Sequence, residues 1–197
     1  MSGRSTVEEA LTRSLAEAAE ALRGVDVAAL ARAVEALVTV RAQGGMIYTA
    51  GNGGSAATAS HLALDLQKAA GVRALSLSDN PGLITAWGND VSFDRVFAGQ
   101  LEVLGRAGDG LIVISVSGSS PNILALLQVA REKGMTSVGL LGCEGGRAAT
   151  LVDASVVVPS SDYGWVESAH TVLHHVLTYA LRDAHAGVHA ARRPARV

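Results

Sequence analysis

Apolar residues recur at helical spacing along the first forty residues of the chain. Leu11, Leu15 and Leu22 fall on one face at the period of an amphipathic helix. A second apolar repeat begins after Asp26 and ends at a pair of glycines, a common helix stop. Because two helices precede any strand, the pattern predicts an N-terminal helical hairpin over residues 1–44.

Five short apolar runs follow at regular intervals, each bounded by glycine, serine or proline. They occupy residues 46–50, 74–78, 110–117, 136–142 and 154–160. Short runs rich in Val, Ile and Leu are typical of buried strands, and helix-length segments separate these five. Strands that alternate with helices form right-handed crossovers in a parallel sheet. The pattern predicts an α/β fold, a doubly wound, five-stranded parallel sheet, as one domain over residues 1–185 with its core in 45–185.

The two ends of the chain read differently from this core. The last helix is expected at residues 165–183, and residues 186–197 lack apolar periodicity and end in basic residues, so we expect a disordered tail. The N-terminus is polar and charged, without the apolar segment of a signal peptide. No apolar run approaches the roughly 18 residues that a membrane span needs. We therefore expect no membrane association.

Composition narrows the class of protein further. Hydrophobic residues make up 49% of the chain and aromatic residues 4%, so the core must be aliphatic. The formal net charge of -2 argues against a nucleic-acid partner, which requires clustered lysine and arginine. Cys143 is the single cysteine and cannot form an internal disulfide, which is typical of the reducing cytoplasm. We expect a cytoplasmic protein.

Two of the strand-to-helix turns consist almost entirely of small and polar residues. They are GNGGS at residues 51–55 and SVSGSSPN at residues 115–122. In open α/β sheets, ligands bind beyond the C-terminal ends of the strands, where helix N-termini offer free N–H groups to an anion. Neither turn has the lysine of a P-loop or a complete dinucleotide pattern. The turns predict a site for a phosphate-bearing ligand other than a nucleotide, although tight turns without a ligand would also suit this composition.

Histidines and carboxylates gather on two of the predicted helices. His61 and Asp65 lie four residues apart, about 40° around one helix. The last helix carries a glutamate and three histidines, Glu167, His170, His174 and His175. Zinc accepts histidine nitrogen and carboxylate oxygen, usually from four ligands, whereas paired charges on a helix surface would explain the same spacing. Helical geometry favours His174 over His175 as the neighbour of Glu167, since seven residues differ by only about 20°.

Several segments in order resemble the SIS domain of phosphoheptose isomerases. They are GNGGSAATASH, GND at residues 88–90, SVSGSSPNI, AREKGMTSVGLLG and ESAHTVLHH. The resemblance runs from about Gly45 to Arg182 and includes the paired N-terminal helices. It implies a flavodoxin-like SIS fold, a homotetramer with active sites shared between subunits, and zinc-dependent isomerisation of sedoheptulose 7-phosphate.

The resemblance also implies roles for individual residues. The phosphorylated sugar would be bound by Asn52, Gly53, Ser55, Asp90, Ser115, Ser117, Ser119, Ser120 and Glu167, with the serines of the second turn on the phosphate. The metal would be held by His61, Asp65, Glu167 and His175. Asp65 would be the catalytic base of an enediol mechanism and His175 its acid–base partner, so the resemblance points to His175 where helical geometry favours His174. His170 also matches a histidine often found in the family.

Several positions depart from the family pattern, among them three in the predicted site. Asp65 stands where the family has glutamate, Glu167 where it has glutamine, and Val116 where a threonine is usual. Such changes near the substrate fit a different long-chain sugar, including the octulose 8-phosphate of lincosamide antibiotic pathways. The alternative function is a non-catalytic SIS protein that binds phosphosugars or the replication protein DnaA.

Overall fold

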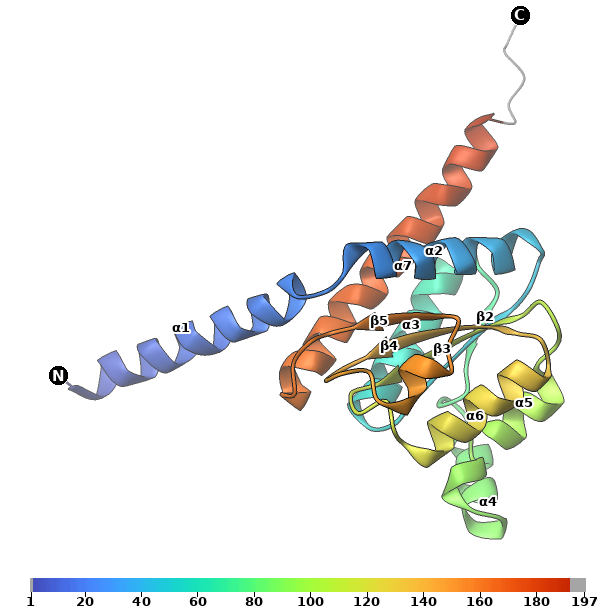
Figure 1. Cartoon of the computed structure of the whole chain (residues 1–197), viewed down its shortest axis with the longest axis horizontal. Coiled ribbons are helices and arrows are strands. Elements are labelled where there is room, and N and C mark those ends of the chain that lie inside the picture. The colour runs from blue at the N-terminus through green and yellow to red at the C-terminus, as the bar shows by residue number, and fades with distance from the viewer. Residues whose placement is uncertain (1, 192–197) are drawn as a thin grey trace, which may run out of the picture.

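The structure is a computed structural model (Figure 1) that describes residues 2–191, with the side chains of residues 6–184. Its strands are β1 (Ile47–Gly51), β2 (Ala74–Ser76), β3 (Gly110–Ser115), β4 (Thr136–Leu141) and β5 (Ala154–Val157). Its α-helices are α1 (Ser2–Arg23), α2 (Val27–Ala42), α3 (Gly54–Lys68), α4 (Pro81–Asp90), α5 (Ala98–Leu104), α6 (Pro121–Glu132) and α7 (Tyr163–Ala191). Two 3₁₀ turns, η1 (Phe93–Arg95) and η2 (Arg147–Thr150), complete the described elements.

All five strands join one parallel sheet in the order β2-β1-β3-β4-β5. This confirms the predicted doubly wound, flavodoxin-like sheet. The direction of winding reverses between β1 and β3, whose ends lie side by side because Gly51 pairs with Ile114. At such a point the connections leave toward opposite faces and open a crevice between the two following turns. The GNGGS and SVSGSSPN turns therefore meet at one place.

Helices cover both faces of the sheet because successive strand residues point to opposite sides. Ile112 and Ile114 of β3 pack with α2, α3 and α7, whereas Leu111 and Val113 pack with α5 and α6. All four side chains are fully buried. Full burial of one such side chain contributes about 1.5–3 kcal/mol. Figure 1 shows the two helical layers on either side of the strands.

The N-terminal helices differ from the expected hairpin. In Figure 1, α1 continues in nearly the same direction as α2 and projects away from the sheet instead of folding back along α2. Only the C-terminal end of α1 packs on the core, against α7. Leu11 and Leu15, which predicted an amphipathic helix, are 61% and 73% exposed. The apolar face that a hairpin would bury is thus open along α1.

The other differences concern helix boundaries. The last helix runs to Ala191 instead of residue 183, because its alanine-rich end favours helix. The first half of the expected tail is therefore helical, and residues 192–197 lie outside the described part. The helix α5 was not predicted, because seven residues are too few to display a period.

Within residues 2–191, no helix combines the length and apolar character needed to cross a membrane.

Candidate functional site

The helices α3 and α7 pack side by side and run in the same direction. The first turn of α3, at Gly54, lies against the carboxylate of Glu167 on α7. About two to three turns further along α3, His61 and Asp65 face the histidines of α7. The residues that carry candidate chemistry therefore form two groups, one at the start of the helix pair and one near its middle.

The second group is a carboxylate surrounded by three imidazoles. Asp65 Oδ2 lies 3.3 Å from His174 Nε2, 3.5 Å from His61 Nε2 and 3.6 Å from His175 Nε2. One ligand atom from each of the four residues lies within 4.8 Å of all the others. We name these four residues the His/Asp cluster. The cluster contains three of the four predicted metal ligands, His61, Asp65 and His175, together with His174.

His174 is the innermost member of the cluster. Its side chain is 0% exposed, and neither ring nitrogen has a hydrogen-bond partner of good geometry among the described residues. Burial, together with the neighbouring His175 and His61 and against the opposing effect of Asp65, lowers the pKa of His174 from 6.5 to about 4. The ring is therefore neutral at pH 7, with unpaired nitrogen in a buried position. Such a group is costly unless a partner satisfies it.

His175 has a defined tautomer. Its Nδ1 lies 2.9 Å from the backbone carbonyl of Thr171, and a carbonyl can only accept, so Nδ1 carries the proton. The lone pair of Nε2 then points toward Asp65. A hydrogen bond of this kind fixes the ring orientation and is typical of histidines that bind metals or transfer protons.

The first group lines a small pocket at the crevice between β1 and β3. The pocket, of about 110 Å³, is lined by six predicted residues, Asn52, Ser55, Ser115, Ser117, Ser120 and Glu167, and by Tyr163 and Val116 among others. Hydroxyl groups of the second turn gather here beside the N-termini of α3 and α6. Such an arrangement of hydroxyl and N–H donors suits an anion. We name this the serine pocket.

Other predicted residues lie elsewhere. Glu167 lines the serine pocket and is not a member of the His/Asp cluster. Gly53 precedes α3 as its N-cap residue with a φ of 54°. Ser119 is exposed in the second turn, and Asp90 is exposed at the end of α4, where its carboxylate accepts a hydrogen bond from Asn89. The structure places Ser119 and Asp90 outside the serine pocket.

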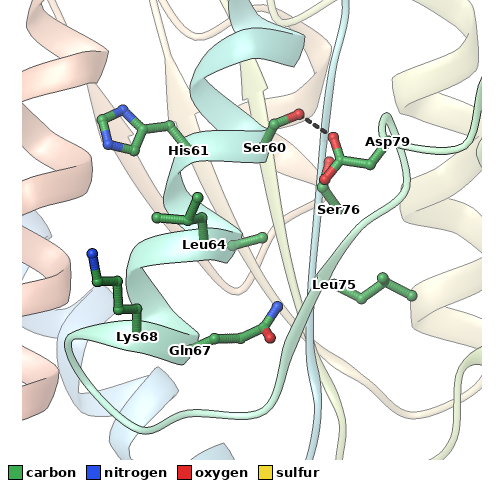
Figure 2. A pocket seen from close by; sticks show the side chains of 9 residues that line it. Ser60, His61, Leu64, Gln67, Lys68, Leu75, Ser76 and Asp79 are labelled. Atoms are coloured by element: carbon green, nitrogen blue, oxygen red, sulfur yellow. Dashed lines mark hydrogen bonds between the residues drawn. The ribbon is translucent and has the colours of Figure 1, made fainter.

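A larger open cavity lies beside the His/Asp cluster. It has a volume of about 760 Å³ between α3 and β2, and His61, Leu64 and Lys68 are among its lining residues. Figure 2 shows His61 and Lys68 pointing to one side of α3, and Ser60 pointing to the other side, where it donates a hydrogen bond to Asp79. This volume is in the usual range for small-molecule sites. The cluster is therefore accessible through His61.

Sequence reasoning missed two residues of the site. Asn122 exchanges side-chain hydrogen bonds with Asn52 beneath the serine pocket, and Tyr163 lines the pocket from the start of α7. Asn122 lies in the second turn, and the available signal in the sequence was an amide side chain directly after Pro121. Nothing in the spacing of the sequence indicated Tyr163, because its position depends on how α7 packs against α3.

Known proteins resemble this chain in sequence. A family model described as the SIS domain matches residues 9–142. The phosphoheptose isomerase of Pelobacter propionicus is 42% identical over 128 residues, which cover 62% of this chain and 68% of that protein.

Solved structures extend the match to most of the chain. The phosphoheptose isomerase of Neisseria gonorrhoeae has a TM-score of 0.85 at 32% identity, with 90% of this chain and 99% of that chain covered. That of Francisella tularensis has a TM-score of 0.83 at 28% identity, with 93% and 100% covered. The resemblance found in the sequence is confirmed. The chain belongs to the SIS-domain family and, within it, to the phosphoheptose isomerases.

Proposed function

We propose that this protein is an aldose–ketose isomerase of a long-chain sugar phosphate, sedoheptulose 7-phosphate or the homologous octulose 8-phosphate. The observation that carries the proposal is the His/Asp cluster, which lies on the same two helices whose first turns border the serine pocket. One group of side chains suits a phosphate, and the other suits proton transfer. An isomerase of phosphorylated sugars needs both.

Substrate binding begins with the phosphate in this proposal. Ser115, Ser117 and Ser120 offer hydroxyl donors, with Ser119 beside them, and the N-terminus of α6 adds backbone N–H groups. Asn52, Gly53 and Ser55 precede or begin α3 and contact the sugar hydroxyls, while Asp90 and Glu167 accept hydrogen bonds from others. The serine pocket thus fixes one end of the substrate and leaves the carbonyl end free.

The chemistry transfers one proton between C1 and C2 of the sugar. Asp65 removes the proton from C1 of the ketose to give the enediolate. The lone pair of His175 Nε2 accepts the proton of the oxygen on C1 and passes it to the oxygen on C2, and Asp65 returns its proton to C2 to form the aldehyde. The three histidine contacts of Asp65 all use Oδ2, so Oδ1 is available for these transfers. A general acid or base of this kind contributes roughly 10²–10⁴-fold to the rate.

The His/Asp cluster also fits a divalent metal, with zinc as the proposed ion. His61, Asp65 and His175 are the predicted ligands that lie together, and the unpaired nitrogens of His174 are the feature that a metal would satisfy. A bound zinc ion supplies Lewis-acid polarisation of the sugar carbonyl and charge stabilisation of the enediolate.

We further propose a cytoplasmic homotetramer with active sites shared between subunits. Support comes from apolar side chains left exposed on three helices, among them Leu15 on α1 at 73%, Leu64 on α3 at 53% and Tyr179 on α7 at 49%. Patches of this kind are typical of subunit interfaces. The open cavity beside His61 would then be closed by a neighbouring subunit.

The test is turnover of sedoheptulose 7-phosphate by the wild-type protein and by Asp65→Asn, with the zinc content of both proteins measured. We expect turnover by the wild type and a loss of roughly 10²–10⁴-fold in Asp65→Asn. Turnover of the octulose phosphate alone would change the substrate and keep the reaction. A folded wild type that binds phosphosugars but converts neither ketose would contradict the isomerase and favour the non-catalytic, DnaA-binding type of SIS protein.

A further inference from the structure

We propose that His174 is the fourth metal ligand of this protein, in place of Glu167, so that one chain supplies the complete ligand set. The inference rests on the proposed function, in which a metal assists the reaction. It concerns only this chain's own residues: His61, Asp65, His174 and His175 would bind the ion. Glu167 would act in the serine pocket instead.

The distances within the His/Asp cluster carry the first part of the argument. Zinc binds histidine nitrogen and carboxylate oxygen at about 2.0–2.1 Å, in a tetrahedron. Two ligand atoms at the corners of such a tetrahedron are about 3.3–3.4 Å apart, since the edge is about 1.6 times the bond length. Asp65 Oδ2 lies 3.3, 3.5 and 3.6 Å from the Nε2 atoms of His174, His61 and His175. The separation between His174 and Asp65 fits this edge at least as well as the other two.

The ring of His174 lies in an environment that offers no other partner within the described part of the chain. The ring is fully buried, and no described residue forms a hydrogen bond of good geometry with either nitrogen. Its centroid lies 3.9 Å from that of His175 and 4.5 Å from that of His61, so all three rings converge on one point. His170 on the same helix is also buried with unpaired ring nitrogens, so it is the convergence of His174 with two other rings on the carboxylate of Asp65 that suits coordination.

Glu167 lies apart from the His/Asp cluster. Its carboxylate lies against Gly54 at the first turn of α3, and it lines the serine pocket. Seven residues separate Glu167 from His174, which corresponds to about 10 Å along the helix. Within one chain, the carboxylate of Glu167 therefore lies in the serine pocket, about two turns along α7 from the His/Asp cluster.

The choice of ligand changes the charge of the site. Three neutral imidazoles and one carboxylate leave a bound divalent ion with a net charge of +1, whereas Glu167 in place of His174 would bring the charge to zero. A positively charged centre stabilises an enediolate oxygen better than a neutral one. The ligand set with His174 therefore also suits the proposed reaction.

The test compares metal binding by three variants of the full-length protein. Co²⁺ and Zn²⁺ affinities are measured by competition with a chelator for wild type, His174→Leu, Glu167→Gln and His170→Leu. His170→Leu is the matched control, because His170 is equally buried on the same helix and lies outside the cluster. Loss of a group that merely orients a ligand typically costs 10–100-fold in affinity. We expect His174→Leu to lose more than about 100-fold and the other two variants to change less than about 10-fold.

A spectroscopic measurement supports the affinities and covers the case in which His174→Leu does not fold. The visible Co²⁺ spectrum of wild type and His174→Asn, which keeps a polar side chain, should differ in band position and intensity, while that of Glu167→Gln should match wild type. A loss of affinity in Glu167→Gln with an unchanged His174→Leu would overturn the inference. So would a wild-type protein that binds neither ion. Turnover of the ketose phosphates is measured separately on wild type, so the isomerase can stand when this inference fails, and metal binding through His174 can stand when turnover is absent.

Discussion

Asn52 and Asn122 exchange two side-chain hydrogen bonds across the crevice between β1 and β3. Asn52 Nδ2 donates to Asn122 Oδ1 at 2.9 Å, and Asn122 Nδ2 donates to Asn52 Oδ1 at 2.8 Å. Asn52 comes from the turn before α3, whereas Asn122 lies in the first turn of α6 and is 1% exposed. The pair therefore joins the two turns that build the serine pocket and sets the distance between them.

Replacing Asn122 by aspartate should weaken this connection while keeping the side-chain shape. The substitution removes a donor and places a carboxylate oxygen opposite Asn52 Oδ1, so two acceptors face each other in a buried position. A buried polar group without a partner costs about 1–3 kcal/mol. We expect a lower midpoint of thermal unfolding and a higher KM for the sugar phosphate. Gln128→Glu makes the same chemical change on the exposed face of α6, where it faces Glu132, so it should cost no more than about 0.5 kcal/mol and leave KM unchanged.

Gly118 lies where the second turn crosses the loop that follows β4. Its φ is +58°, and a Cβ at this position would collide with the backbone carbonyl of Gly145. Gly118→Ala therefore carries both the conformational cost of a left-handed backbone, about 1–2 kcal/mol, and a steric cost of about 1–3 kcal/mol. We expect a clear loss of stability in chemical denaturation, together with loss of phosphate binding.

Gly44→Ala separates the two costs. Gly44 has a φ of +76°, and no atom lies within 4 Å of a Cβ built there. It should therefore lose only the conformational part. Equal losses in the two variants would show that the loop around Gly118 adapts freely and would contradict the tight packing described for the second turn.

The sequence was sufficient for the sheet and for the two turns, because both depend on local patterns. The run ending at residue 117 alternates in the structure between two buried layers, and the glycine and serine turns follow the strands at the reversal point of the sheet. The i, i+4 spacing of His61 and Asp65 predicted one shared helix face, and both side chains contact the same group of histidines.

What could not be predicted depends on how distant elements pack. Helical geometry favoured His174 as the site residue, and the family resemblance favoured His175. In the structure, α7 lies against α3 at an angle that brings both rings to Asp65. The contact of Glu167 with the first turn of α3 follows from the parallel packing of α3 and α7, which no spacing within either helix reveals. The direction of α1 is likewise undetermined, because the apolar face of α1 fits a hairpin and an exposed helix equally well.

His170 should make the stability of the protein depend on pH. It is 0% exposed, and burial lowers its pKa from 6.5 to about 4, an effect that the backbone of Leu141 only partly offsets. Between these two values the unfolded chain binds the proton and the folded chain does not, so the free energy of unfolding falls as the pH falls. The shift corresponds to a loss of about 3 kcal/mol between pH 7 and pH 4.

Urea denaturation of wild type and His170→Leu at pH 7, 6 and 5 checks this effect. The two proteins are compared by the slope of their stability against pH, which removes any constant effect of the substitution on packing. We expect a shallower slope in His170→Leu. Parallel slopes would mean that the ring of His170 binds its proton in the folded state as easily as in the unfolded chain.

Glu167→Gln should strengthen the binding of phosphate. The carboxylate of Glu167 lies in the serine pocket beside the first turn of α3, where it occupies the favourable end of the helix dipole and repels a second anion. Glutamine has nearly the same shape and keeps the hydrogen-bonding oxygen while removing the charge. At an effective dielectric constant of about 20 and a separation of about 6 Å, relief of this repulsion is worth up to about 3 kcal/mol, or roughly 100-fold in affinity. The measurement is the affinity for inorganic phosphate and the KM for the sugar phosphate. The gain should shrink as salt is raised, because screening already reduces the repulsion in wild type.

Glu132→Gln, at the far end of α6, removes the same charge from the molecule and should leave both values unchanged. Weaker phosphate binding in Glu167→Gln would instead mean that the carboxylate positions the donors of the pocket, and that its charge is needed there.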